Sequence, residues 1–160
     1  GLPTRRFCFA AFLPTAQQDR QWILEELKQE TRTMIVYEAP HHLVRTLEEL
    51  GTALGMDRRL TLCRELTKRY EEAYQSTFAE ALQRFETEEP KGECVIVIEG
   101  RSIEDLKREQ QKSWEEMSLE DHMEVYLAQG IDRKEAMKKV AKDRGISKRD
   151  VYQGLMEREG

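Results

Sequence analysis

Cys94-Val95-Ile96-Val97-Ile98-Glu99 is a short apolar run, rich in β-branched residues, that ends on a glutamate. Thr33-Met34-Ile35-Val36-Tyr37-Glu38 and Leu60-Thr61-Leu62-Cys63-Arg64-Glu65 follow the same pattern. Runs of this length and composition are typical of buried β-strands. Because helix-like segments separate the three runs, the sequence predicts an α/β fold in which a mixed sheet has flanking helices.

The glutamates at the ends of these runs suggest a site. In sheets of this class, ligands bind in the crevice beyond the carboxyl ends of the strands. If the three strands end at one edge, Glu38, Glu65 and Glu99 converge on a single crevice. A glutamate after a strand can also be simply the first solvated residue, but three such endings in one short chain favour a site.

The remaining elements follow from helical spacing and from the residues that begin and end helices. Pro40 suits the first turn of a helix, Gly55 suits its end, and Thr77 with Glu80 has the spacing of a capping box. The sequence predicts strands at 5–12, 32–38, 59–65, 69–76 and 93–99. It predicts helices at 18–30 and 40–54, a third that begins after Thr77, and three short ones in the C-terminal part.

Composition indicates a soluble globular chain. Its 160 residues include 36% charged and 39% hydrophobic residues, with a net charge of −5. No apolar stretch approaches the roughly 20 residues of a membrane span, and no signal-peptide pattern is present. The three cysteines lie inside apolar runs, so we expect buried thiols in a reducing cytoplasm. No cysteine or histidine spacing predicts a metal site.

The charge changes sign near the C-terminus. The segment 132–150 carries a basic excess, although the chain as a whole is acidic. We therefore predict three regions: an α/β domain at 1–100, a charged helix or linker at 101–117, and a small basic helical tail, similar to a helix-turn-helix, at 118–160.

Five motifs in order resemble a known family. They are Gly1-Leu2-Pro3-Thr4-Arg5-Arg6-Phe7, Phe12-Leu13-Pro14, Tyr37-Glu38-Ala39-Pro40-His41, Arg64-Glu65-Leu66-Thr67-Lys68 with Glu71-Glu72, and Gly92-Glu93 before Val95-Ile96-Val97-Ile98-Glu99-Gly100. Together they resemble the C-terminal half of the small-subunit rRNA methyltransferases of the tetrapyrrole (corrin/porphyrin) methylase family. The chain departs from the family pattern at Ala11 and Ser76, where glycine is usual, and at His42, where arginine is usual.

The resemblance implies a two-domain enzyme that uses S-adenosyl-L-methionine in the cleft between its domains. The implied reaction is 2′-O-methylation of a cytidine ribose in 16S rRNA of the small ribosomal subunit. The family's first domain is not among these 160 residues, so we expect the chain to be inactive alone and to need the N-terminal domain of a parent chain. A homodimer is a further possible partner, and no membrane partner is expected.

The resemblance also implies site residues. Those placed near the cofactor are Tyr37, Glu38, Glu65, Leu66, Glu99 and Gly100. Methyl transfer to a hydroxyl needs alignment and a polarised oxygen, and the candidates nearest the chemistry are Arg64, Glu65 and Lys68. Glu65 or Glu38 could act as the base, and Lys68 or Arg64 could hold a phosphate. Arg64 and Glu65 could instead form a structural ion pair, and His41 could bond the turn at the start of its helix.

The tail offers candidates for RNA contact. Cationic side chains position nucleic acids through phosphates without reading sequence, and those proposed here are Lys138, Lys139, Lys142, Lys148 and Arg149. The alternative is a solvated helix pair. Arg20 could face RNA from the Pro14 loop or be an exposed helix charge. Two other functions remain open for the chain: a small-molecule tetrapyrrole methylase and a non-catalytic RNA-binding module.

Overall fold

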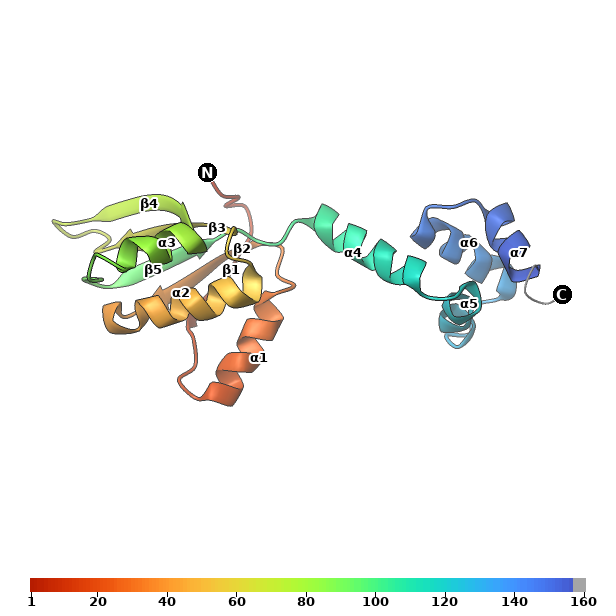
Figure 1. Ribbon diagram of the computed structural model, residues 1–160, viewed down its shortest axis with the longest axis horizontal. Helices are drawn as coiled ribbons and strands as arrows, with labels where there is room; N and C mark the ends of the chain where they lie inside the picture. The colour runs from red at the N-terminus through yellow and green to blue at the C-terminus, as the bar shows by residue number, and fades with distance from the viewer. Residues whose placement is uncertain (157–160) are drawn as a thin grey trace. The chain divides into compact units, whose positions relative to one another are not determined.

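The computed structural model describes residues 1–156. The chain divides into two compact units, one of residues 1–102 and one that begins at Ile103 (Figure 1). The first unit contains β1 Phe7–Phe12, α1 Gln17–Leu27, β2 Thr33–Glu38, α2 Pro40–Leu54, β3 Arg59–Arg64, β4 Glu72–Thr77, α3 Phe78–Phe85 and β5 Cys94–Ile98. The second contains α4 Ile103–Glu116, α5 Leu119–Leu127, α6 Arg133–Arg144 and α7 Lys148–Met156. The predicted α/β class is confirmed.

The five strands form one mixed sheet in the order β1-β2-β5-β3-β4. β1 and β2 are parallel, whereas β5 runs antiparallel to both of its neighbours, β2 and β3. β2 and β3 therefore point in the same direction and β5 points in the opposite one. This arrangement decides which strand ends meet.

Alternating side chains along the strands divide the sheet into a buried face and an open face. Met34, Val36, Ile96 and Leu62 are buried and belong to the core with the apolar positions of α1, α2 and α3. Their neighbours in sequence are less buried, because successive residues of a strand point to opposite faces. The three helices pack on the buried face (Figure 1).

The second unit has a small core of its own. Val140 and Val151 are fully buried in it, and Met123 and Leu155 are nearly so. Gly145 adopts a left-handed conformation (φ 65°), which ends α6 and lets the three residues 145–147 turn the chain into α7. The predicted pair of short helices joined by a turn at Gly145 is thus present, and its likeness to a helix-turn-helix stays a prediction.

Candidate active site

The carboxyl ends of β2 and β3 lie on the same side of the sheet, at an edge formed by strand ends and not by an outer strand. Cys94, the first residue of β5, pairs with Glu38 on one side and with Arg64 on the other. The two strands that carry Glu38 and Arg64 are thus separated only by β5, a distance of roughly 10 Å. Glu65 follows Arg64 directly, so two of the three predicted glutamates share this edge, which we call the β2–β3 edge.

Glu99 does not join them, and the expectation of one crevice for all three glutamates is wrong. Because β5 is antiparallel, its carboxyl end lies at the opposite edge, where Ile98 pairs with Met34 and Leu60. Glu99 there forms a salt bridge with Arg59. The sequence pattern showed where strands end but not their direction.

Gly100 also lies at the opposite edge, where it packs against backbone atoms. A Cβ atom built on it would lie 2.2 Å from the carbonyl oxygen of Thr31. The next residue, Arg101, donates its backbone N–H to the carbonyl of Glu30 at 2.7 Å. The resemblance places Gly100 near the cofactor, whereas in the structure it packs against the loop before β2.

Glu65 is held by the turn that leads into β5. Its backbone N–H donates to the carbonyl of Glu93 at 3.1 Å, and the backbone N–H of Glu93 donates to Glu65 Oε1 at 3.1 Å. Lys68 Nζ lies 3.3 Å from the same Oε1 and 3.0 Å from Glu93 Oε2. These carboxylates raise the pKa of Lys68, with the bond to Glu93 as the largest cause. Lys68 therefore stays cationic beside Glu65.

The loop after β3 has a strained backbone. Glu65 and Thr67 have φ angles of 50° and 65°, a left-handed conformation that costs a side-chain-bearing residue about 1–3 kcal/mol. Gly92, also at positive φ, approaches Glu65 so closely that a Cβ there would lie 2.3 Å from Oε1. Such outliers persist only where the surroundings enforce them, and they concentrate at functional sites.

The carboxylate of Glu65 is only partly engaged by the residues that the structure describes. Within residues 1–156 only Oε1 of its carboxylate accepts hydrogen bonds, and the side chain retains 25% of its exposure. Leu66 and Tyr37 are 40% and 39% exposed. A carboxylate that can accept from a hydroxyl, with exposed apolar side chains at the same edge of the sheet, matches the needs of an adenosyl group, which has ribose hydroxyls and a flat apolar ring. The residues therefore fit part of S-adenosylmethionine.

Glu38 has a different role, because its carboxylate is buried and fully engaged. Oε1 accepts from the backbone N–H of Ala39 at 2.8 Å, and Oε2 accepts from the hydroxyl of Thr46 at 2.7 Å. Thr46 in turn accepts from Arg20 Nη2 at 2.7 Å, and Arg20 also pairs with Glu49. Glu38 thus joins β2 to α2 and α1, and we remove it from the candidate bases.

Arg20 itself differs from both sequence-based interpretations. The guanidinium is buried rather than exposed, and Nη1 donates to the carbonyl of Pro14 at 3.3 Å. It therefore fixes the loop before α1, and protein groups engage its guanidinium. The helical register of α1 could have predicted this burial, because Arg20 lies one turn before the buried Leu24 on the same face.

Arg64 and Glu65 do not pair with each other. Arg64 forms its salt bridge with Glu72 on β4, which also binds Arg84 of α3. These two arginines lower the pKa of Glu72, with the bond from Arg84 as the largest cause. Arg64 therefore ties β3 to β4 and α3, whereas Lys68 is the cation that pairs with Glu65.

Sequence reasoning did not single out the aromatic cluster beside this edge. Tyr37 contacts Phe9 and Phe12 edge to face, with ring centroids 5.0 and 5.8 Å apart, and both phenylalanines are more than half exposed. Phe7 on the same strand is also 53% exposed. These phenylalanine rings lie along β1, an outer strand of the sheet, and they alternate with Cys8 and Ala10, which pack against the core. In the sequence, Phe7 and Phe9 alternate along β1, and this pattern could have predicted that their rings share one face.

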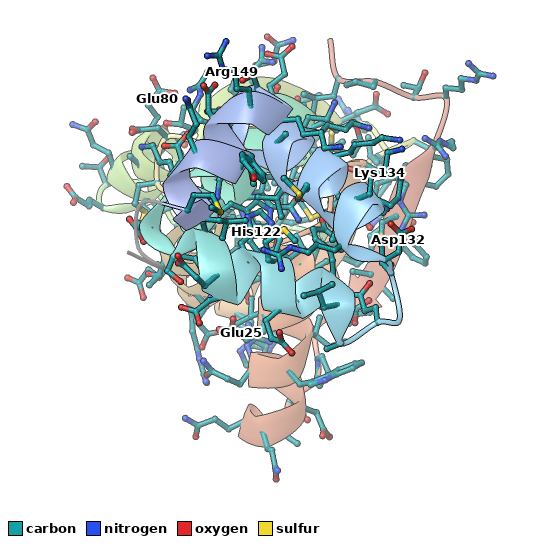
Figure 2. All side chains as sticks on the ribbon, turned by 90° about the vertical axis from the view of Figure 1, so that its right-hand side faces the viewer. Glu25, Glu80, His122, Asp132, Lys134 and Arg149 are labelled. Carbon is teal, nitrogen blue, oxygen red and sulfur yellow. The ribbon has the colours of Figure 1, made fainter. Side chains whose placement is uncertain are left out.

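Arg144 is a structural cation of the basic tail. Arg144 donates Nε to Nδ1 of His122 at 3.1 Å and Nη2 to the carbonyls of Met117 and Ser118 at 2.5 and 2.9 Å. His122 is fully buried and stacks on Trp114 at 4.0 Å; Figure 2 shows it among the helices, with Lys134 and Arg149 toward the outside. Burial, followed by the charge of Arg144, lowers the pKa of His122.

Comparison with curated proteins gives matches over nearly the whole chain. It is 41% identical over 159 residues to ribosomal RNA small subunit methyltransferase I of a Synechocystis species. It is 42% identical over 152 residues to the protein of that name from Halalkalibacterium halodurans, and 39% identical over 152 residues to that of Bacillus subtilis. These alignments cover 99%, 95% and 95% of this chain.

The chain resembles ribosomal RNA small subunit methyltransferase I. It spans about half the length of these relatives, with shares of 55%, 52% and 51%. No family model matches the sequence.

Solved structures give weaker likenesses than the methyltransferase I sequences do. The methyltransferase CobJ aligns with a TM-score of 0.46 and 16% identity over 62% of this chain and 44% of its own. The cobalt precorrin-4 methyltransferase CbiF aligns with a TM-score of 0.45 and 14% identity over 60% and 41%. Among the described residues, no helix is long and apolar enough to cross a membrane.

Proposed function

We propose that the chain is the C-terminal half of an S-adenosylmethionine-dependent methyltransferase that modifies the 2′-hydroxyl of a cytidine in 16S rRNA. The sequence similarity to methyltransferase I proteins supports the reaction class. The main structural support for the proposed site is the ion pair of Glu65 and Lys68 on a strained loop at the β2–β3 edge. Among the described residues, one oxygen of Glu65 has no hydrogen-bond partner. The proposed cofactor contacts at this edge are Tyr37, Glu65 and Leu66.

The chemistry divides between the cation and the carboxylate. When bound, S-adenosylmethionine supplies an activated methyl group on a sulfonium. In this proposal Lys68 holds an RNA phosphate or polarises the ribose hydroxyl, and Glu65 accepts a hydroxyl proton or a hydrogen bond from ribose. Positioning can lower such a barrier by about 7–11 kcal/mol, and a base adds about 10²–10⁴-fold. The fixed backbone around Glu65 suits the positioning role.

The exposed aromatic cluster supports a longer parent protein. Phe9, Phe12 and Tyr37 give an apolar surface of the kind that marks an interface. Because the relatives are nearly twice as long as this chain, we assign that surface to the remaining part of the parent. Much of the cofactor pocket would then lie outside these residues. Calorimetry should show S-adenosylmethionine binding weaker than the micromolar range for this chain alone, and micromolar binding would contradict the shared pocket.

The catalytic proposal is tested in the parent by substituting two ion pairs, Glu65–Lys68 at the β2–β3 edge and Arg59–Glu99 at the opposite edge. Glu65→Gln and Lys68→Gln should each lower kcat/KM for methylation of small ribosomal subunits by tenfold or more. The free energy of unfolding should change little, because both side chains are partly exposed and solvent screens the pair.

Arg59→Gln and Glu99→Gln are the controls, since they remove the same kinds of charge at the opposite edge. They should leave kcat/KM within about twofold. Equal losses of kcat/KM at both edges would show that the Glu65–Lys68 pair is only structural. A loss of kcat/KM in proportion to the loss of folding stability would show the same. Transfer to a tetrapyrrole rather than RNA would favour the small-molecule methylase.

A further inference from the structure

A basic hollow lies between the first turns of α6 and α7. It is lined by Arg133, Lys134 and Met137 from α6 and by Lys148, Arg149 and Tyr152 from α7. Each helix contributes residues at positions i, i+1 and i+4, which share one face. The four cations are exposed and Tyr152 is 54% exposed, so all are accessible.

The acidic residues of segment 132–150 are already engaged. Asp132 accepts from the backbone N–H groups of Lys134 and Glu135 as the N-cap of α6. Asp150 accepts from the backbone N–H of Ser147, and Asp143 accepts from the hydroxyl of Tyr126. Asp132 and Asp150 still offset part of the local charge, and four cations against two carboxylates leave the hollow positive.

The cations of the hollow differ from the others in the tail. Within the part of the chain that the structure describes, Arg133, Lys134, Lys148 and Arg149 form no ion pair. Lys138 pairs with Glu135 at 2.9 Å, and Lys139 lies over the ring of Tyr126 at 5.5 Å. The five tail residues singled out from sequence are therefore not equivalent, and only Lys148 and Arg149 line the hollow.

The hollow has the chemistry of a single-stranded nucleic-acid site. Cations there can hold phosphates, and an exposed aromatic ring offers a stacking platform for a base. Regular duplex RNA fits less well, because its bases are stacked within the helix and offer no free face to the ring of Tyr152. The N-termini of both helices also direct their positive dipole ends toward this region.

We infer that this hollow binds single-stranded RNA, with Arg133, Lys134, Lys148 and Arg149 on the phosphates and one base stacked on Tyr152. The inference rests on the proposed function, because it names the surface by which the second unit engages an rRNA substrate. It adds a binding site that is separate in sequence from the β2–β3 edge.

The test is fluorescence anisotropy of the 160-residue chain with a fluorescein-labelled 12-nucleotide single-stranded RNA, titrated from 50 to 200 mM KCl. Replacing Arg133, Lys134, Lys148 and Arg149 together with Gln should weaken binding at least tenfold at 50 mM. The slope of log K against log salt should flatten by about 0.7 for each phosphate that the variant no longer neutralises.

A charge-matched control replaces Lys112, Lys138, Lys139 and Lys142 with Gln. It removes the same charge from the same unit and should weaken binding less than threefold. Tyr152→Ala should weaken binding about fivefold or more, whereas Tyr152→Phe keeps the ring and should bind within twofold of wild type. Circular dichroism of each variant checks that the helices are intact.

Three results would overturn the inference: no RNA binding by the wild-type chain, equal losses in the two quartets, or no effect of Tyr152→Ala. Competition by poly-glutamate as effective as that by unlabelled RNA would also overturn it, because the hollow would then bind any polyanion. Each result is distinct from failure of the proposed function, which is read from methyl transfer by Glu65 and Lys68 variants of the parent.

Discussion

The two edges of the sheet both carry a glutamate after a strand and a neighbouring glycine, yet they are built differently. At the β2–β3 edge, Glu65 sits on a strained loop, shares Oε1 with Lys68 and keeps Oε2 free within residues 1–156. At the opposite edge, Glu99 pairs with Arg59 on regular backbone, and Gly100 packs against the loop before β2. The comparison indicates that one edge is organised for a ligand and the other for packing.

The largest expected effect on stability belongs to Gly100→Ala. Its Cβ would overlap the backbone of Thr31 and Arg32, which cannot move aside as a flexible side chain can. We expect a loss of about 3 kcal/mol in the free energy of unfolding, at the top of the usual range for overpacking. Urea unfolding of the chain measures it. Gly55→Ala, where open space surrounds a positive φ, is the control for conformational strain alone.

Glu38→Ala should cost about 2 kcal/mol. It leaves the hydroxyl of Thr46 and the N–H of Ala39 without their acceptor in a buried setting. Glu38→Gln should cost less, because one amide oxygen can still accept. Urea unfolding gives both values. If Glu38→Ala leaves stability unchanged, the carboxylate does not stabilise the contact between β2 and α2. Glu38 then becomes a candidate base again.

Ala11→Gly should be stabilising by about 1 kcal/mol. Ala11 has a φ of 52° at the irregularity in the β1–β2 pairing, a conformation that glycine adopts without steric cost. The gain is reduced by the greater freedom of glycine in the unfolded chain. A rise in the urea midpoint with an unchanged m-value would confirm it. A fall would mean that contacts of the methyl group outweigh the backbone strain.

The smallest effect is that of Glu99→Gln, whose pair with Arg59 is largely solvated. The hydrogen bond from Arg59 is the largest cause that lowers the pKa of Glu99. The stabilisation is therefore present above about pH 4.5 and is lost as pH falls through the lowered pKa. Wild type should lose stability between pH 5 and pH 3 by up to about 0.5 kcal/mol more than the variant. Identical pH profiles would show that the pair contributes nothing to stability.

The sequence predicted the elements of this fold more surely than their directions. Cys94–Ile98 is apolar enough to be recognised as a strand, but nothing in its residues tells that it inserts antiparallel between β2 and β3. The predicted position of Glu99 was therefore at the wrong edge. The prediction for Arg20 failed for a related reason, since its burial depends on Thr46 and Glu49 of another helix. Glu65 and Lys68 lie three residues apart, so local sequence sufficed to bring them together.

The central claim is that the β2–β3 edge, rather than the opposite edge, contacts S-adenosylmethionine. Residue-resolved hydrogen exchange of the parent protein, with and without S-adenosylmethionine, tests it most directly. We predict slower exchange on binding at the backbone amides of 37–39 and 64–68, and unchanged exchange at 99–101. Protection at 99–101 with none at 64–68 would contradict the claim.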